Sequence, residues 1–275
     1  MNPHAVRSTS PVTLLRSIST NRSLLYSLIR RDIAGRYSGS VLGLLWSFFN
    51  PVLMLIVYTF VFSVVFKARW VGGSDSKTEF ALVLFAGLMV FNLFSECINR
   101  APGLILSNVN YVKKVIFPLE ILPIVNLGSA FFHLLVNFIV WLIFYVVFYG
   151  VPHAGVLLFP LVILPLALLT LGVSWFIASL GVYLRDVAQV VGTFVPVLMF
   201  LSPVFYPLKS LPERFQGVVQ ISPITVAVEQ ARGLMYWGEA FDWQMWGLYL
   251  AISCCIAWFG FVWFQKTRKG FADVL

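Results

Sequence analysis

Charged side chains are scarce in this sequence. They make up 11% of its 275 residues, whereas hydrophobic residues make up 60%; a soluble domain carries about 25% charged residues. A soluble fold of this length would need far more polar surface, so the composition excludes that class and predicts an integral membrane protein. The net charge of +8 gives no support to nucleic-acid binding and is typical of loops that contact anionic membrane lipids.

Groups that carry chemistry are also few. The three histidines lack metal-ligand spacing, so we expect no metal site and no cofactor. The sequence contains no G-x-x-x-x-G-K-[ST] motif for ATP phosphates, and no serine, cysteine or carboxylate has an evident base partner. We therefore expect that the chain is not an enzyme. Cys97, Cys254 and Cys255 fall in apolar runs, and we predict three small buried hydrophobic residues.

Glu96 and His133 are the ionisable residues that approach the middle of an apolar run. Such groups usually mark ion or proton paths. Arg100 follows Glu96 at the four-residue spacing that joins side chains on one helix face. The sequence favours a satisfied Glu96–Arg100 pair, and a proton relay is the alternative.

Long apolar runs fill most of the chain. The first, from Val41 to Phe66, carries no charge; as a helix it would be about 39 Å long, and a bilayer core is about 30 Å thick. Charges, prolines and glycines separate the runs. The predicted spans are Val41–Phe66, Phe80–Ile98, Ile121–Tyr149, Val156–Tyr183, Val187–Tyr206 and Trp243–Phe264. The predicted fold is thus an all-α integral membrane protein with six transmembrane helices, formed by residues 41–275.

Residues 1–40 are predicted to be a cytoplasmic tail that contains an amphipathic interfacial helix. Leu24, Leu25, Leu28 and Ile29 fall on one helical face. A disordered basic tail is the alternative, and we expect residues 1–12 to be one.

The connection 207–242 is too interrupted by proline and glycine to span, and too apolar for an ordinary solvated loop. We predict two short re-entrant helices there. One would start at Ser210 in "SLPE", with Ser210 as cap and Glu213 reaching back. The other would start at Ser222 in "SPIT", with Pro223 in the first turn.

Lysine and arginine placement predicts the orientation. With both termini on one side of the membrane, most of the 19 basic residues fall on that side. Both termini are therefore predicted to be cytoplasmic.

Three stretches resemble one family: "RRDIAGRYSGSVLGLLWSFFNPVLMLIVYTFVFSVVFKARW" (30–70), "NVNYVKKVIFPLEILP" (108–123) and "FQKTRKGFADVL" (264–275). They are similar to permease subunits of ABC exporters for bacterial surface polysaccharides, above all O-antigen (lipopolysaccharide) permeases. The resemblance implies a homodimer in the inner membrane that docks two copies of a separate ATPase subunit and exports an undecaprenyl-diphosphate-linked polysaccharide. A capsular polysaccharide or teichoic-acid permease of the same architecture is the alternative. The tail before Pro11 has no counterpart in the family.

The resemblance also implies a coupling helix at about residues 108–115, which would sit in a groove of the ATPase. Ser107 would cap it and Pro118 would stop it. Its expected contact residues are Asn108, Asn110, Tyr111, Val112, Lys113 and Lys114. The alternative is a solvated loop that touches lipid headgroups.

In the family the first and fifth spans line the glycan channel, where aromatic faces let sugar rings slide. The matching residues here are Trp46, Phe49, Asn50, Tyr58, Phe194, Phe200, Phe205 and Tyr206. For each of them, lipid contact or core packing is the alternative.

Arg30, Arg31 and Arg36 stand just before the first span. Guanidinium groups suit phosphate oxygens, so these residues are predicted to attract the lipid diphosphate. The alternative is that they only follow the positive-inside rule.

Overall fold

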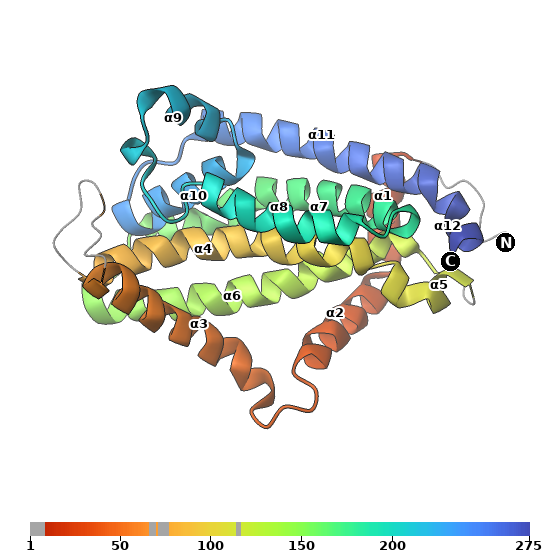
Figure 1. Cartoon of the computed structure of the whole chain (residues 1–275), viewed down its shortest axis with the longest axis horizontal. Coiled ribbons are helices and arrows are strands. Elements are labelled where there is room, and N and C mark those ends of the chain that lie inside the picture. Colours follow the sequence, from red (N-terminus) through yellow and green to blue (C-terminus); the bar gives the residue numbers. More distant parts are fainter. Residues whose placement is uncertain (1–8, 66–69, 71–76, 114–116) are drawn as a thin grey trace.

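The protein is described by a computed structural model for residues 9–65, 70, 77–113 and 117–275, with the backbone alone at 63, 64 and 77. Within these ranges the chain is helical and contains no strand. The helices form an elongated bundle (Figure 1). The predicted all-α class is confirmed.

Twelve α-helices are numbered in chain order over the described ranges. They are α1 (Pro11–Thr20), α2 (Arg22–Arg36), α3 (Trp46–Tyr58), α4 (Lys77–Arg100), α5 (Val109–Lys113), α6 (Leu122–Tyr149), α7 (Phe159–Tyr183), α8 (Val187–Leu201), α9 (Glu213–Gln220), α10 (Pro223–Arg232), α11 (Trp243–Thr267) and α12 (Phe271–Val274). Two π-helical turns continue helices, Thr59–Val65 after α3 and Gly233–Trp237 after α10.

Five helical segments in the described ranges are long and apolar enough to cross a membrane. They are Gly43–Phe62, Thr78–Gly103, Leu119–Tyr149, Ala154–Tyr183 and Trp243–Val274. The predicted fifth span, Val187–Tyr206, is too long: α8 ends at Leu201, where Ser202 turns extended at ψ 146°. Pro203 follows, and a residue before proline is disfavoured in helical geometry. At 15 residues, α8 is about 22 Å long.

Helix α4 forms the centre of the bundle and α3 lies at its edge. Of the most apolar window in each, 83% is buried for α4 and 17% for α3. The large side chains Phe91, Leu82 and Met89 of α4 are fully enclosed. A helix that is apolar all round belongs in a core, whereas the exposed apolar surface of α3 requires lipid or a partner chain to cover it.

Helices α7 and α11 pack against each other through glycine. A Cβ on Gly260 would lie 2.0 Å from the backbone oxygen of Gly172, and a Cβ on Gly172 would lie 2.5 Å from the oxygen of Ile256. Only glycine permits such an approach, and small residues are the usual means of bringing membrane helices together. The two helices therefore meet backbone to backbone.

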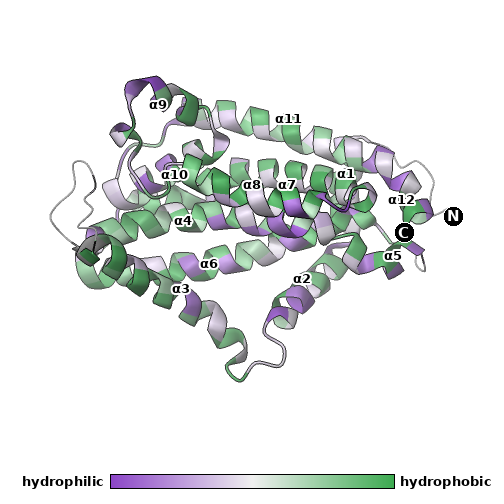
Figure 2. Ribbon diagram, in the orientation of Figure 1, coloured by the Kyte–Doolittle hydropathy of each residue, from purple (hydrophilic) through white to green (hydrophobic). Residues whose placement is uncertain are grey.

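The described ends of the chain, at α1 and α12, lie at the same end of the bundle as α5, while α9 and α10 lie at the opposite end (Figure 1). Hydrophilic residues gather on α9 and α2, and the long helices are mainly hydrophobic (Figure 2). Helix α8 runs from the end near α5 towards α9.

The predicted amphipathic helix corresponds to α2. Leu25 and Leu28 are buried and Ile29 is half-buried, while Leu24 is 36% exposed. Ile29 packs over Gly128 of α6, where a Cβ would lie 2.4 Å from its Cδ1. The apolar face of α2 thus contacts the bundle.

Two local predictions fail. Helix α9 begins at Glu213 after Pro212, and Ser210 belongs to the preceding 3-10 turn, so the Ser210 capping box is wrong. Ser222 does cap α10, without a side-chain hydrogen bond. Cys97 is buried as predicted, but Cys254 and Cys255 are exposed on α11, because no described part of the chain covers the apolar face on which they lie.

Candidate functional site

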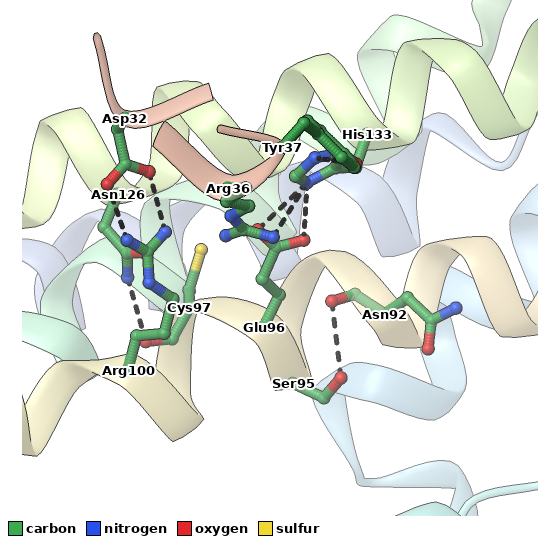
Figure 3. A network of polar contacts seen from close by, with 10 residues as sticks. All are labelled: Asp32, Arg36, Tyr37, Asn92, Ser95, Glu96, Cys97, Arg100, Asn126 and His133. Atoms are coloured by element: carbon green, nitrogen blue, oxygen red, sulfur yellow. Dashed lines mark hydrogen bonds and ion pairs between the residues drawn. The ribbon is translucent and has the colours of Figure 1, made fainter. Parts of the chain in front are cut away.

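Two ion pairs join α2 to α4 (Figure 3). Arg100 donates from Nη1 and Nη2 to Oδ2 and Oδ1 of Asp32 at 2.8 and 2.6 Å, and Arg36 pairs with Glu96. Each helix carries its acid four residues before its base, and antiparallel packing sets acid against base at both positions. We call these four residues the charge ladder. The predicted Glu96–Arg100 pair is wrong, because α2 supplies the partner of each.

His133 of α6 joins this cluster (Figure 3). Its Nδ1 lies 3.1 Å from each carboxylate oxygen of Glu96 and 3.3 Å from Nη1 of Arg36. Its Nε2 lies 3.2 Å from the hydroxyl oxygen of Tyr37. Both ring nitrogens therefore have polar neighbours, and the network ties the end of α2 to α4 and α6.

Asp32 is held as a carboxylate. Burial acts to raise its pKa, but the hydrogen bonds from Arg100 and the positive charges of Arg100 and Arg36 outweigh burial and lower it. Donors to a carboxylate favour its charged form. Nearby, the Asn126 side chain donates from Nδ2 to the Cys97 carbonyl at 3.0 Å, which ties the start of α6 to α4.

The three arginines predicted at the entrance have different surroundings. Arg36 is engaged by Glu96 and His133. Arg31 donates from Nη2 to the hydroxyl of Tyr111 at 2.9 Å. Arg30 is exposed on α2. The structure therefore does not bring the three together into one cluster, and their predicted role in binding phosphate stays a prediction.

The predicted coupling segment contains a five-residue helix, α5. Ser107 and Asn108 lie in the preceding 3-10 turn, and Asn108 donates to the Leu104 carbonyl at 2.8 Å. Val112 is buried, while Tyr111 stacks on Phe117 with ring centroids 4.3 Å apart.

Asn110 and Lys113 are the exposed members of the predicted docking set on α5. Lys114 and Val115 lie outside the described residues. The buried and stacked side chains therefore anchor the helix, and the exposed ones are available to a partner.

A buried ion pair that sequence reasoning missed joins two of the three quoted stretches. Arg268, which is 8% exposed, donates from Nη1 to Oε2 of Glu120, which is 2% exposed, at 2.8 Å. Ser17 donates to the other carboxylate oxygen at 3.2 Å. The signal was present: Glu120 stands alone among apolar residues in "FPLEILP", and a buried acid requires a basic partner.

The predicted channel aromatics do not form one cluster. Trp46, Phe49 and Asn50 are exposed on α3, and Phe194 and Phe200 are exposed on α8. Tyr206 is half-buried, and its hydroxyl donates to the carbonyl of Phe200 at 3.2 Å, so it closes the end of α8.

Phe62 connects the two predicted sets and was missed by the sequence analysis. Its ring lies 6.4 Å from that of Tyr58 and stacks on Phe205 at 5.9 Å, and Phe205 stacks on Phe200 at 5.4 Å. Phe62 lies four residues after Tyr58, one helical turn further along the same face. The structure thus joins the end of α3 to the end of α8 through a row of four aromatic rings.

Arg232 of α10 is buried at the end of the bundle opposite α5. It donates to the backbone carbonyls of Val83, Pro203 and Val204. Its guanidinium carbon lies 4.5 Å from the ring centre of Trp70. The carbonyls left free where α8 stops are thereby satisfied by one side chain.

Comparison with known proteins places the sequence among transporters. The sequence model of the ABC-2 type transporter family matches residues 23–236. An O-antigen export system permease protein of Myxococcus xanthus is 26% identical over 95% of this chain and 99% of its own length. One from Klebsiella pneumoniae is 24% identical over 92% and 95%. A capsule polysaccharide export inner-membrane protein of Neisseria meningitidis serogroup A is 24% identical over 83% and 84%.

Proposed function

Because the chain belongs to the ABC-2 type transporter family, we propose that it is the membrane-spanning permease subunit of an exporter of lipid-linked O-antigen polysaccharide. The observation that carries this proposal is the match, over nearly the whole of both chains, to a permease named for O-antigen export. The substrate would be an undecaprenyl-diphosphate-linked glycan in the bacterial inner membrane. The chain itself would be no enzyme, and two copies of a separate subunit would hydrolyse ATP.

Six crossings with both termini in the cytoplasm fit the architecture. The five long apolar segments and α8 would each cross, with α8 completed by the extended chain from Ser202 to Tyr206. Helices α9 and α10 would return within the outer half of the membrane. Helices α1, α5 and α12 lie at the same end of the bundle, which supports this orientation. The excess of basic residues at that end supports it as well.

The exposed face of α5 is the proposed docking surface for the ATPase. Asn110 and Lys113 are exposed, while Val112 and Tyr111 fix the helix to the bundle. Tyr111 also accepts a hydrogen bond from Arg31 of α2. Movement of α5 on ATP binding would therefore pull on α2.

The exposed aromatic side chains of α3 and α8 are the proposed glycan contacts, in a channel formed with a second copy of the chain. Sugar rings stack on aromatic faces through their C–H surfaces while their hydroxyls remain hydrated. Trp46, Phe49, Phe194 and Phe200 have the exposure that this role requires. A capsule exporter is the second candidate, supported by the relative from Neisseria.

The test uses the chain co-expressed with the ATPase subunits of its source organism that belong to polysaccharide exporters. We expect Lys113→Glu to abolish co-purification of the two subunits and the appearance of surface O-antigen. The matched control is Lys209→Glu, which changes an exposed lysine at the opposite end and should leave both unchanged. ATP hydrolysis by the permease alone, or normal pairing of Lys113→Glu, would contradict the proposal. Loss of capsule with O-antigen intact would favour the second candidate.

A further inference from the structure

A polar cavity of about 530 Å³ lies between α2, the end of α4, the turn before α5 and the start of α6. Three of its lining residues, Asp32, Arg100 and Asn126, come from three different helices and point toward one another (Figure 3). Its polar lining includes Arg31, Asp32, Asn99, Arg100, Asn108 and Asn126. The cavity lies at the end of the bundle near α5.

Asn126, which lines this cavity, has a side-chain oxygen that lacks a hydrogen-bond donor. The residue is 2% exposed, and its Oδ1 is buried without a hydrogen-bond partner. Its Nδ2 is already used by the Cys97 carbonyl, which fixes the amide so that the oxygen remains the free atom. A buried acceptor without a partner costs free energy, and an O–H or N–H donor in the adjoining cavity would remove that cost. A phosphate monoester above its second pKa of about 6 supplies no such donor, whereas a sugar supplies several.

The charges of the lining favour an anion as well. Asp32 and Arg100 neutralise each other in a bidentate pair, so Arg31 leaves the lining with a net positive charge. Arg31 uses one N–H on Tyr111, and a guanidinium has five. The remaining donors suit phosphate oxygens.

We propose that this cavity binds a phosphorylated sugar, with the phosphate on Arg31 and a sugar hydroxyl donating to Oδ1 of Asn126. Asn99 and Asn108 supply further amide groups for hydroxyls. The inference rests on the proposed function, since the phosphate and first sugar of a lipid-linked glycan have this chemistry. It adds a specific subsite for the sugar. Asn99, Asn108 and Asn126 form this subsite, and attraction of a lipid phosphate by arginine alone would not need them.

The position of the cavity gives the ligand a second effect. One wall is Arg31 of α2 and another is Asn108 beside α5. A bound sugar phosphate would contact both elements at once. Occupancy would therefore stiffen the connection between the interfacial helix and the proposed ATPase docking segment.

Binding is tested at pH 8 with the full chain in phosphatidylcholine nanodiscs, using glucose 1-phosphate, methyl phosphate and glucose as probes. We expect glucose 1-phosphate to bind at least tenfold more tightly than either of the others, measured by NMR titration. Asn126→Leu should weaken glucose 1-phosphate at least tenfold and leave methyl phosphate unchanged. Arg31→Gln should weaken both.

Asn137→Leu is the matched control, since Asn137 lies on the same helix and is half-buried; it should change neither affinity. If Asn126→Leu does not fold, the same affinities are measured for Asn99→Leu, which changes an exposed lining residue and should weaken glucose 1-phosphate alone. Equal affinity for methyl phosphate and glucose 1-phosphate would overturn the sugar subsite. Loss of binding in phosphatidylglycerol nanodiscs would overturn it too, and would assign the cavity to lipid headgroups.

Surface polysaccharide separates this inference from the proposed function. Export that depends on the chain, without any binding of glucose 1-phosphate, would remove the subsite and leave the function standing. Binding that follows the expected pattern in a chain whose deletion leaves all surface glycans intact would support the subsite and remove the export role.

Discussion

The two ends of the bundle hold their buried arginines in different ways. At the end near α5, Arg268 meets the carboxylate of Glu120, a side chain. At the opposite end, Arg232 donates to Oε1 of Glu229 at 3.1 Å but mainly to three backbone carbonyls, two of them just after the end of α8. A side-chain partner can be replaced by mutation, whereas a backbone partner cannot. The first end is therefore tolerant of paired changes, and the second depends on one residue.

The largest expected effect is at Arg232. Replacing it with Met leaves buried carbonyls without donors, and we expect a loss of about 4–5 kcal/mol in unfolding free energy. Arg232→Lys should recover only part of it, because an ammonium cannot reproduce the fork. Thermal unfolding in detergent measures both.

Arg214→Met is the control for this change. Arg214 is exposed on α9 and stacks over Phe215 at 4.7 Å, so its loss should stay within about 0.5 kcal/mol. Equal melting temperatures for the two variants would refute the carbonyl-binding role.

The second prediction concerns the Glu120–Arg268 pair. Glu120→Gln leaves the Arg268 charge buried without its counter-charge and should cost about 3 kcal/mol. The double variant Glu120→Leu with Arg268→Met should recover most of this loss, since apolar residues can replace a buried pair. If the double variant is as unstable as the single one, the contrast between the two ends fails. Glu213→Gln, at an exposed acid on α9, serves as control.

The third prediction uses pH. The folded pKa of Asp32 lies below its ordinary value, so the stability from its pair with Arg100 is present above about pH 3.9 and is lost as pH falls through the folded pKa. The pair is partly exposed, and Asp32→Asn should cost about 1 kcal/mol at pH 6.

The melting temperatures of the wild type and Asp32→Asn should therefore converge as the pH falls below the folded pKa of Asp32. A difference that persists there would show that the aspartate acts through packing rather than through its charge.

The smallest expected effect on stability is at the exposed aromatics. Trp46→Ala and Phe49→Ala should each change unfolding by about 0.5 kcal/mol and yet reduce surface glycan. Phe91→Ala is the control, because Phe91 is enclosed in α4 and its loss should cost about 3–5 kcal/mol. Comparable destabilisation at Trp46 would place it in helix packing and remove it from the channel.

The long helices could be predicted because each follows from a local property, an apolar run between charges. The end of α8 could not be predicted from the sequence, because the apolar run continues past Leu201 to Tyr206. The helix stops only because the backbone becomes extended at Ser202, before Pro203. Capping at Ser210 failed for a similar reason, since Pro212 set the start of α9.

The polar site was harder to predict because its pairs join different helices. Glu96 and Arg100 are spaced so that they could pair with each other within α4, or each could pair with a residue of α2. Choosing between them requires the register of α2, which Ile29 and Gly128 set by contact. Phe62, by contrast, was available from the sequence, one turn after Tyr58.

The glycine contact between α7 and α11 makes these two helices one rigid lever. Their backbones meet at Gly172 and Gly260, and the end of α11 continues into Arg268 and α12 beside α5. A helix of 25 residues is about 38 Å long. A tilt of about 5° imposed at the end near α5 would then displace the far end by about 3 Å, so a small movement beside α5 becomes a displacement on the scale of a water molecule at the opposite end of the bundle.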